Sequence, residues 1–225
     1  VGDHFKARKF ITGFTGSAGT AVITLDEAGL WTDGRYFVQA ENQLKDSTVT
    51  LYRMGEEGVP TVDEFVKDRL KEGGCLGFDG RVVNGTWGGR LEKIAAEKNV
   101  SMHVTEDLID LIWEDRPALS KQPLFILEEK YSGKSTADKI ADLRKAMKEN
   151  GADVHILTSL YDIAWLLNIR GNDIDYVPVV LSYLVLNETE CIWFLQEEVV
   201  DDKIRAYLEL SLIHISEPTR LRCIS

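Results

Sequence analysis

The sharpest candidate for a binding residue is Arg35, in the run WTDGRY of residues 31–36. The Asp-Gly pair predicts a tight end to a strand and leaves Arg35 at the mouth of the next helix. A guanidinium there could hold a peptide carboxylate or carbonyl, because its planar set of donors matches such acceptors. The alternative is a salt bridge from Arg35 to Asp33 that only fixes the turn. Taken alone, the residues favour this alternative.

A second candidate is the glycine-rich turn of residues 13–19, GFTGSAG. Its spacing fits neither the dinucleotide-binding fingerprint nor the P-loop, and it lacks the P-loop lysine. Ser17 does not lie in the Gly-x-Ser-x-Gly pattern of a nucleophile elbow. We therefore predict a structural role, in which the glycines let the chain turn and pass close to a neighbouring backbone before a strand at Thr20.

Histidines and carboxylates suggest no catalytic constellation. His4, His103 and His155 are scattered, and His155 lies in an apolar segment that is typical of a packed core residue. Acidic pairs such as Asp201 and Asp202 fit the solvated ends of helices. We predict neither a catalytic residue nor a metal ligand in this chain.

Composition narrows the class of partner. The 26 basic and 37 acidic residues give a net charge of −11, which repels nucleic-acid backbones and anionic membrane surfaces. The apolar runs are too short to span a bilayer, and residues 1–10 do not form a signal peptide. The three cysteines, Cys75, Cys191 and Cys223, suggest neither a disulfide framework nor a thiolate metal site. We expect a cytoplasmic protein with no nucleic-acid or membrane partner.

Strands that alternate with helices predict an α/β fold in the first half. Residues 20–25 and 29–32 should form a hairpin, and Thr61 with Glu64 has the spacing of a capping box. The other expected elements are a helix from about residue 35, a strand at 75–78, a helix at 87–98, a strand at 101–104 and a helix at 107–113.

The second half starts again after residues 114–123, a stretch with two prolines that we interpret as a linker. We expect a strand at 124–127, a helix capped by Ser135 and ended by Gly151, and a buried strand at 154–158.

An internal repeat relates the two halves. Residues 10–16 match residues 165–171, and residues 22–31 match residues 184–193, with an insertion around 172–179. Each copy predicts the end of a helix, a turn, two paired strands and a further helix. Chance similarity is the alternative. Only residues 1–9 precede the first copy, so we expect a natural N-terminus to be missing.

The end of the chain is expected to be foreign to the fold. Residues 210–220, LSLIHISEPTR, resemble the translation of a transposase adapter used in shotgun sequencing. The predicted domains are therefore 1–119, truncated at its start, and 120–209, followed by an extraneous tail at 210–225. The alternative is a frayed helix with a polar end.

Several of these segments carry a family resemblance. Residues 6–44, with the glycine-rich turn and WTDGRYF, closely resemble the first domain of the three-domain Xaa-Pro aminopeptidases, also called aminopeptidase P. Residues 112–117, IWEDRP, resemble the end of that domain. Residues 162–172, DIAWLLNIRGN, resemble the signature of the second domain.

The resemblance implies two tandem creatinase-like N-terminal domains with mixed sheets and flanking helices. In the family, a third domain with the pita-bread fold holds two metal ions, usually manganese, and it is expected to be absent here. The chain would then be an inactive part of an enzyme that releases the first residue from Xaa-Pro peptides. Its domains would serve homodimerisation and substrate gating.

The same resemblance assigns substrate-binding residues. Arg35 falls on an arginine that contacts bound peptide in the family, and Arg170 is a weaker candidate that would face the third domain. The alternative function is a non-catalytic peptide- or histone-binding module, since a histone chaperone subunit carries a related domain. Metal ligands encoded downstream would decide between the two.

Overall fold

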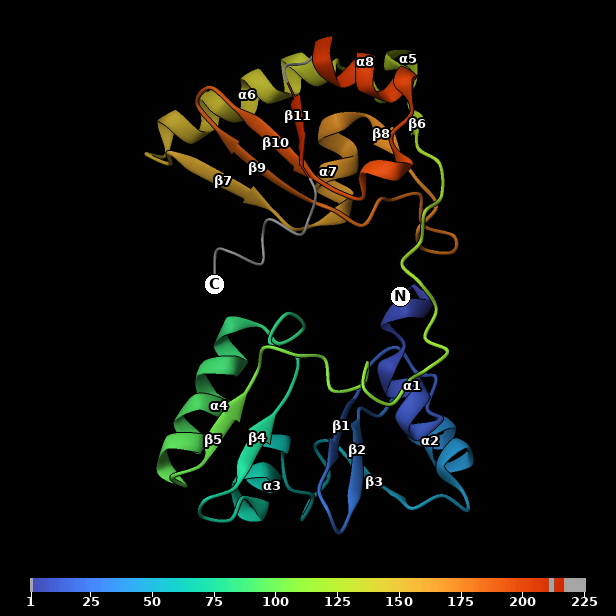
Figure 1. Ribbon diagram of the computed structural model, residues 1–225, viewed down its shortest axis with the longest axis vertical. Helices are drawn as coiled ribbons and strands as arrows, with labels where there is room; N and C mark the ends of the chain where they lie inside the picture. The colour runs from blue at the N-terminus through green and yellow to red at the C-terminus, as the bar shows by residue number, and fades with distance from the viewer. Residues whose placement is uncertain (1, 211–212, 217–225) are drawn as a thin grey trace. The chain divides into compact units, whose positions relative to one another are not determined.

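The computed structural model describes residues 2–210 and 213–216 and divides the chain into two compact units (Figure 1). The N-terminal unit is Asp3–Ala118. The C-terminal unit is Leu119–Ser225, together with Val1–Gly2. Each unit has a hydrophobic core of its own.

The N-terminal unit alternates helices and strands. In chain order its elements are η1 (Asp3–Phe5), α1 (Ala7–Thr12), β1 (Thr20–Ile23), β2 (Ala28–Thr32), α2 (Phe37–Leu44), β3 (Val49–Arg53), α3 (Val62–Arg69), β4 (Cys75–Gly77), α4 (Gly85–Glu97) and β5 (Ser101–His103). β1 and β2 are antiparallel, β3 is parallel to β2, and β4 pairs with β5 in parallel. The predicted hairpin is confirmed.

Aromatic and aliphatic side chains of β2 fill the core of this unit. Leu30 packs with Phe14, Ala40 and Leu44 in one buried cluster. On the other face of the strand, Trp31 stacks on Tyr52 of β3, with ring centroids 4.1 Å apart. Because successive residues of a strand point to opposite faces, β2 supports packing on both sides.

Local caps fix the helix starts as predicted. The Thr61 hydroxyl accepts a hydrogen bond from the Glu64 amide at 3.2 Å, and the Glu64 carboxylate accepts one from the Thr61 amide at 2.8 Å. This reciprocal capping box satisfies two amides that a helix start leaves unpaired.

The predicted helix over residues 107–113 is wrong. The segment consists of turns, in which the Asp110 amide bonds the Asp107 carbonyl three residues back at 3.0 Å. Both carboxylates converge on Arg116 Nη1, at 2.6 Å for Asp107 and 2.5 Å for Asp110. Side-chain bonds to a mostly buried arginine thus replace the regular helical pattern.

The C-terminal unit contains a second mixed sheet. Its elements are β6 (Phe125–Ile126), α5 (Glu129–Ser132), α6 (Thr136–Glu149), β7 (Val154–Leu157), α7 (Leu160–Leu167), β8 (Ile169–Arg170), β9 (Tyr183–Asn187), β10 (Cys191–Phe194), η2 (Glu197–Val199), α8 (Asp202–Leu210) and β11 (Ile213–Ser216). The main sheet has the order β11-β10-β9-β7, and β6 pairs with β8. Figure 1 shows α6 and α8 along one side of this sheet.

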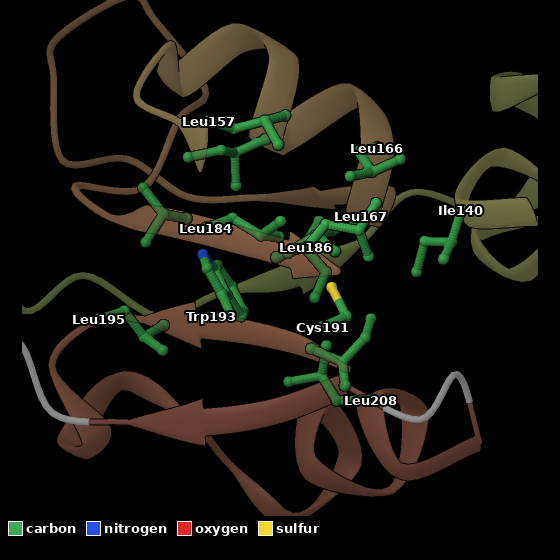
Figure 2. Packing of buried hydrophobic residues seen from close by; sticks show 14 of the residues in the cluster. Ile140, Leu157, Leu166, Leu167, Leu184, Leu186, Cys191, Trp193, Leu195 and Leu208 are labelled. Carbon is green, nitrogen blue, oxygen red and sulfur yellow. The ribbon is translucent and has the colours of Figure 1, made fainter. Parts of the chain in front are cut away.

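One face of the sheet forms the larger core. Leu184 and Leu186 of β9 and Trp193 of β10 are fully buried and meet Leu166 and Leu167 of α7 (Figure 2). The opposite face is more open. Ile156 of β7 is 63% exposed, so the prediction of a buried strand at 154–158 is wrong. β7 is an edge strand of an antiparallel pair, which can face water on one side.

The internal repeat is confirmed by the order of elements. The series α1, β1, β2, α2, β3 recurs as α7, β9, β10, α8, β11, with an antiparallel hairpin followed by a parallel strand in both copies. Trp31 of β2 and Trp193 of β10 are both fully buried, although the hairpin registers make Leu30, and not Trp31, the counterpart of Trp193. The two units are therefore copies of one α/β fold, as predicted.

Part of the segment 210–225, which was expected to be foreign to the fold, belongs to the sheet. Ile213–Ser216 form β11, which pairs in parallel with β10, and Ile213 is only 4% exposed in the core. Excluding this stretch from the fold was wrong, because β11 fills the place that β3 has in the first copy. Residues 217–225, with Cys223, lie outside the described residues, and the foreign origin of the tail stays a prediction.

Candidate functional site

The Arg35 turn, residues 32–36, connects β2 to α2. The Tyr36 amide donates to the Asp33 carbonyl at 2.9 Å, and the Arg35 amide donates to Asp33 Oδ1 at 3.1 Å. An aspartate that bonds the backbone two residues on closes such a turn locally. Gly34 gives the turn its small middle residue. The sequence therefore places Arg35 at the start of α2, as predicted.

Arg35 forms a two-point ion pair within this turn. Its Nε and Nη2 donate to Asp33 Oδ1 and Oδ2 at 2.8 and 2.7 Å. The hydrogen bond from Arg35 is the main cause that lowers the pKa of Asp33 from 3.8 to about 2. The salt bridge named as the alternative is thus present. Arg35 is nevertheless 70% exposed, and no bond from its Nη1 is found in the described part of the chain.

Tyr36 connects this arginine to the glycine-rich turn of residues 13–19. The Arg35 guanidinium lies 5.4 Å from the centre of the Tyr36 ring, and the Tyr36 hydroxyl is 2.6 Å from Ser17 Oγ. The same ring meets Phe14 edge to face. The candidate site is therefore the Arg35 side chain next to the Tyr36 ring, which Ser17 contacts at its hydroxyl.

The glycine-rich turn has the structural role predicted for it. Gly13 ends α1 with φ +74°, a conformation that glycine adopts without strain. A Cβ at Gly19 would lie 2.8 Å from the Trp31 carbonyl oxygen, so only glycine allows this close approach. Arg8, which the sequence reading missed, donates to the carbonyls of Gly16 and Gly19 and holds the turn in place.

The chain repeats the Asp-Gly-Arg turn after β4. The Arg81 amide and Nε donate to Asp79 Oδ1 at 3.0 and 2.9 Å, and Arg81 Nη2 donates to Asp79 Oδ2 at 2.8 Å. This geometry matches that of Asp33 and Arg35 within 0.1 Å. The triplet DGR occurs twice in the sequence, and this signal was overlooked. The ion pair alone therefore does not mark a binding site.

Arg170, the second predicted residue, lies in the C-terminal unit on β8. Its Nη1 donates to the carbonyls of Ala164 and Ile169, the former in the last turn of α7. A cation at this position interacts favourably with the end of the helix dipole. Burial lowers the pKa of this half-buried guanidinium. These bonds give Arg170 a structural role. Its role in substrate binding stays a prediction.

A buried lysine beside Arg170 was also missed. Lys139 of α6 is 2% exposed and donates to the Trp165 carbonyl at 2.8 Å and to Asn168 Oδ1 at 2.6 Å. Burial is the main cause that lowers its pKa, and the nearby Arg170 and Lys134 lower it further. Within residues 2–210 and 213–216, no ion pair of Lys139 with a carboxylate is found. Its acceptors lie 26 and 29 residues along the chain, which no local pattern reveals.

The expectation that His155 is a packed core residue is wrong, because His155 is exposed on β7. His103 Nε2 lies 3.0 Å from Glu106, three residues on, and His4 Nδ1 lies 2.8 Å from the Pro117 carbonyl oxygen. The described side chains include no group of three or more histidines, cysteines or carboxylates that could hold a metal ion. They do not fit a dinuclear centre. No described helix is both long and apolar enough to cross a membrane.

Comparisons with known proteins cover nearly the whole chain. Two models described as the creatinase/prolidase N-terminal domain match residues 5–112 and 115–222. Aminopeptidase P1 of Lotus japonicus is 40% identical over 215 residues, which are 95% of this chain and 32% of that protein. A probable Xaa-Pro aminopeptidase P of Coprinopsis cinerea is 42% identical over 203 residues, which are 89% of this chain and 32% of that protein.

One solved structure is similar throughout. It is the X-prolyl aminopeptidase of Caenorhabditis elegans, described as a cytosolic enzyme with a dinuclear active site. It matches with a TM-score of 0.91 and 35% identity over 98% of this chain and 36% of that one. The chain thus spans about a third of the length of the relatives it matches.

Proposed function

Because the chain belongs to the creatinase/prolidase N-terminal domain family and carries two such domains in tandem, we propose that it is the substrate-recognition part of an Xaa-Pro aminopeptidase. Such an enzyme is a metallopeptidase that releases the first residue from peptides with proline at the second position. The observation that carries the proposal is the similarity to aminopeptidases P at about 40% identity through both units.

In this proposal, hydrolysis belongs to the remainder of the protein. The relatives are about three times longer, and the C. elegans enzyme is described as having a dinuclear site. We infer that two divalent ions, with manganese as the first choice, bind downstream of these domains. The present domains gate the substrate and contribute to a homodimer in the cytoplasm. None of their described side chains takes part in bond cleavage.

Arg35 is the residue of this chain that we assign to the peptide. Its exposed guanidinium has donors that no described residue occupies, and it lies beside the Tyr36 ring, whose hydroxyl contacts Ser17. Arg170, which donates to the Ala164 carbonyl of α7 and to the Ile169 carbonyl, is assigned to the surface that faces the metal-binding part.

The test is Arg35→Ala in the full-length gene product, assayed on an Xaa-Pro peptide. We expect a higher KM or a lower kcat with an almost unchanged melting temperature, because exposed ion pairs contribute little to stability. Arg81→Ala is the matched control, since it removes the same ion pair from the other Asp-Gly-Arg turn. Equal kinetic effects of the two variants, or a large loss of stability for Arg35→Ala alone, would contradict the assignment. A full-length protein that cleaves no Xaa-Pro peptide would disprove the function itself.

A further inference from the structure

The Arg35 guanidinium already holds one carboxylate before any ligand arrives. Asp33 occupies Nε and one edge of Nη2, at 2.8 and 2.7 Å. The two hydrogens of Nη1 and the second hydrogen of Nη2 remain on the outer edge. Since Arg35 is 70% exposed, this edge is available to a ligand.

The carboxylate of Asp33 is itself accessible. Its side chain is 37% exposed, whereas the Asp79 side chain in the matching turn is only 9% exposed. A ligand on the outer edge of Arg35 therefore interacts with the positive charge of Arg35 and with the negative charge of Asp33. The low pKa of Asp33, about 2, keeps this carboxylate charged at neutral pH.

Charge complementarity then selects the kind of acceptor. A free carboxylate on Arg35 would gain attraction from the guanidinium and lose much of it to repulsion by Asp33. A peptide carbonyl carries no net charge, so it keeps the hydrogen bonds without this repulsion. The geometry favours a carbonyl acceptor over a carboxylate.

We propose that Asp33 is a positioning and specificity-determining residue, which holds Arg35 as half of a neutral pair so that Arg35 binds a backbone carbonyl of the peptide instead of a free C-terminal carboxylate. This inference rests on the proposed peptidase function. It assigns the site to peptides that continue past the contacted carbonyl, and it gives no advantage to a short peptide whose carboxylate ends there.

The experiment measures KM for pairs of Ala-Pro peptides of three to five residues, each as the free acid and as the C-terminal amide. It uses the full-length gene product at low salt, because salt screens exposed charges. We expect the wild type to show an acid-to-amide KM ratio within about twofold of one at every length. Asp33→Asn should lower this ratio by about threefold or more at the length where the carboxylate reaches Arg35.

Matched variants make the result specific. Asp33→Glu restores the charge and should return the ratio toward the wild-type value. Asp79→Asn removes the equivalent charge from the other turn and should leave the ratio unchanged. A change in KM ratio is not produced by a merely structural role, which would alter acid and amide alike.

The contrary outcomes are distinct. A wild-type preference for the acid of tenfold or more, or an unchanged ratio in Asp33→Asn, overturns the inference while cleavage itself upholds the peptidase. If Arg35→Ala leaves KM and kcat unchanged for both members of each pair, the assignment of Arg35 fails and this inference fails with it. Absence of cleavage of any peptide overturns the proposed function as a whole.

Discussion

The buried Lys139 has two opposing effects on stability: its hydrogen bonds stabilise the fold, and the burial of its charge destabilises it. Its bonds to the Trp165 carbonyl and Asn168 Oδ1 join α6 to the end of α7. We expect Lys139→Met to lower the free energy of unfolding by about 1–3 kcal/mol at pH 7, because two buried acceptors lose their donor. Urea denaturation measures the loss. Lys134→Met is the control, since the Lys134 side chain is 42% exposed and bonds the surface carboxylate of Asp142 among the described residues.

The pH dependence of this effect has a definite sign. The folded protein lowers the pKa of Lys139 below 10.5, so the unfolded chain binds this proton more tightly. The charged form therefore destabilises the folded state below the folded pKa, and this penalty disappears as the pH rises toward 10.5. The stability of the wild type relative to Lys139→Met should thus increase from pH 7 to pH 10. A difference that stays constant would contradict the lowered pKa.

Residues whose partners are near in sequence were predictable, and those with distant partners were not. The bonds from Arg35 to Asp33 and from Thr61 to Glu64 span two and three positions, so the spacing alone indicated them. The burial of Lys139 was not predictable, because the pattern of its helix indicates an amphipathic face and not the distant carbonyl and amide that Lys139 bonds. The sequence also could not predict whether Arg35 binds peptide, because Arg81 lies in the same Asp-Gly-Arg motif.

At the scale of elements, the β1–β2 hairpin depends on Gly19. A Cβ there would meet the Trp31 carbonyl oxygen at 2.8 Å, and a backbone atom cannot move away easily. We expect Gly19→Ala to lower the stability of the N-terminal unit by about 1–3 kcal/mol through backbone strain. Chemical denaturation followed by tryptophan fluorescence reports it, since Trp31 lies on β2.

The control is Gly89→Ala in α4. Apart from its chain neighbours and the backbone of its own helix, no described residue has an atom within 4 Å of a Cβ at this position, and alanine favours a helix interior over glycine by about 0.5–1 kcal/mol. This variant should be neutral or stabilising. If both substitutions had the same effect, the close approach at Gly19 would not matter to the fold.

The elements that could be predicted are those with a local signal. Alternating apolar residues and turn residues defined the β1–β2 hairpin, and side-chain caps defined α3 and α6. The sequence pattern predicted a helix at 107–113 because it does not reveal that Arg116 forms ion pairs with two aspartates of this segment. The exposure of β7 depends on its place at the sheet edge, which an apolar run does not reveal.

At the scale of the whole molecule, the repeat gives two units whose cores consist of their own residues. The repeat was detectable because each copy has a glycine turn and a buried tryptophan in the second strand of its hairpin. As predicted from the sequence, the repeat ended at a helix and residues 210–220 were expected to be foreign, whereas in the structure a parallel strand follows that helix in both copies, β3 after α2 and β11 after α8. β11 pairs in parallel with β10, as β3 pairs with β2, and Trp193 lies opposite Ile215 in this register.

This conflict leads to a decisive measurement by scanning calorimetry. Ile213 is buried among the residues of the C-terminal core, so Ile213→Asp places an unpaired charge there and should lower the melting temperature of that unit by roughly 10 °C or more. The transition of the N-terminal unit should stay where it is. His214→Asp, at the next and exposed position of the same strand, should change neither transition. If Ile213→Asp proves as harmless as His214→Asp, residues 213–216 are extraneous to the fold, and the C-terminal core is complete without the strand that the repeat requires.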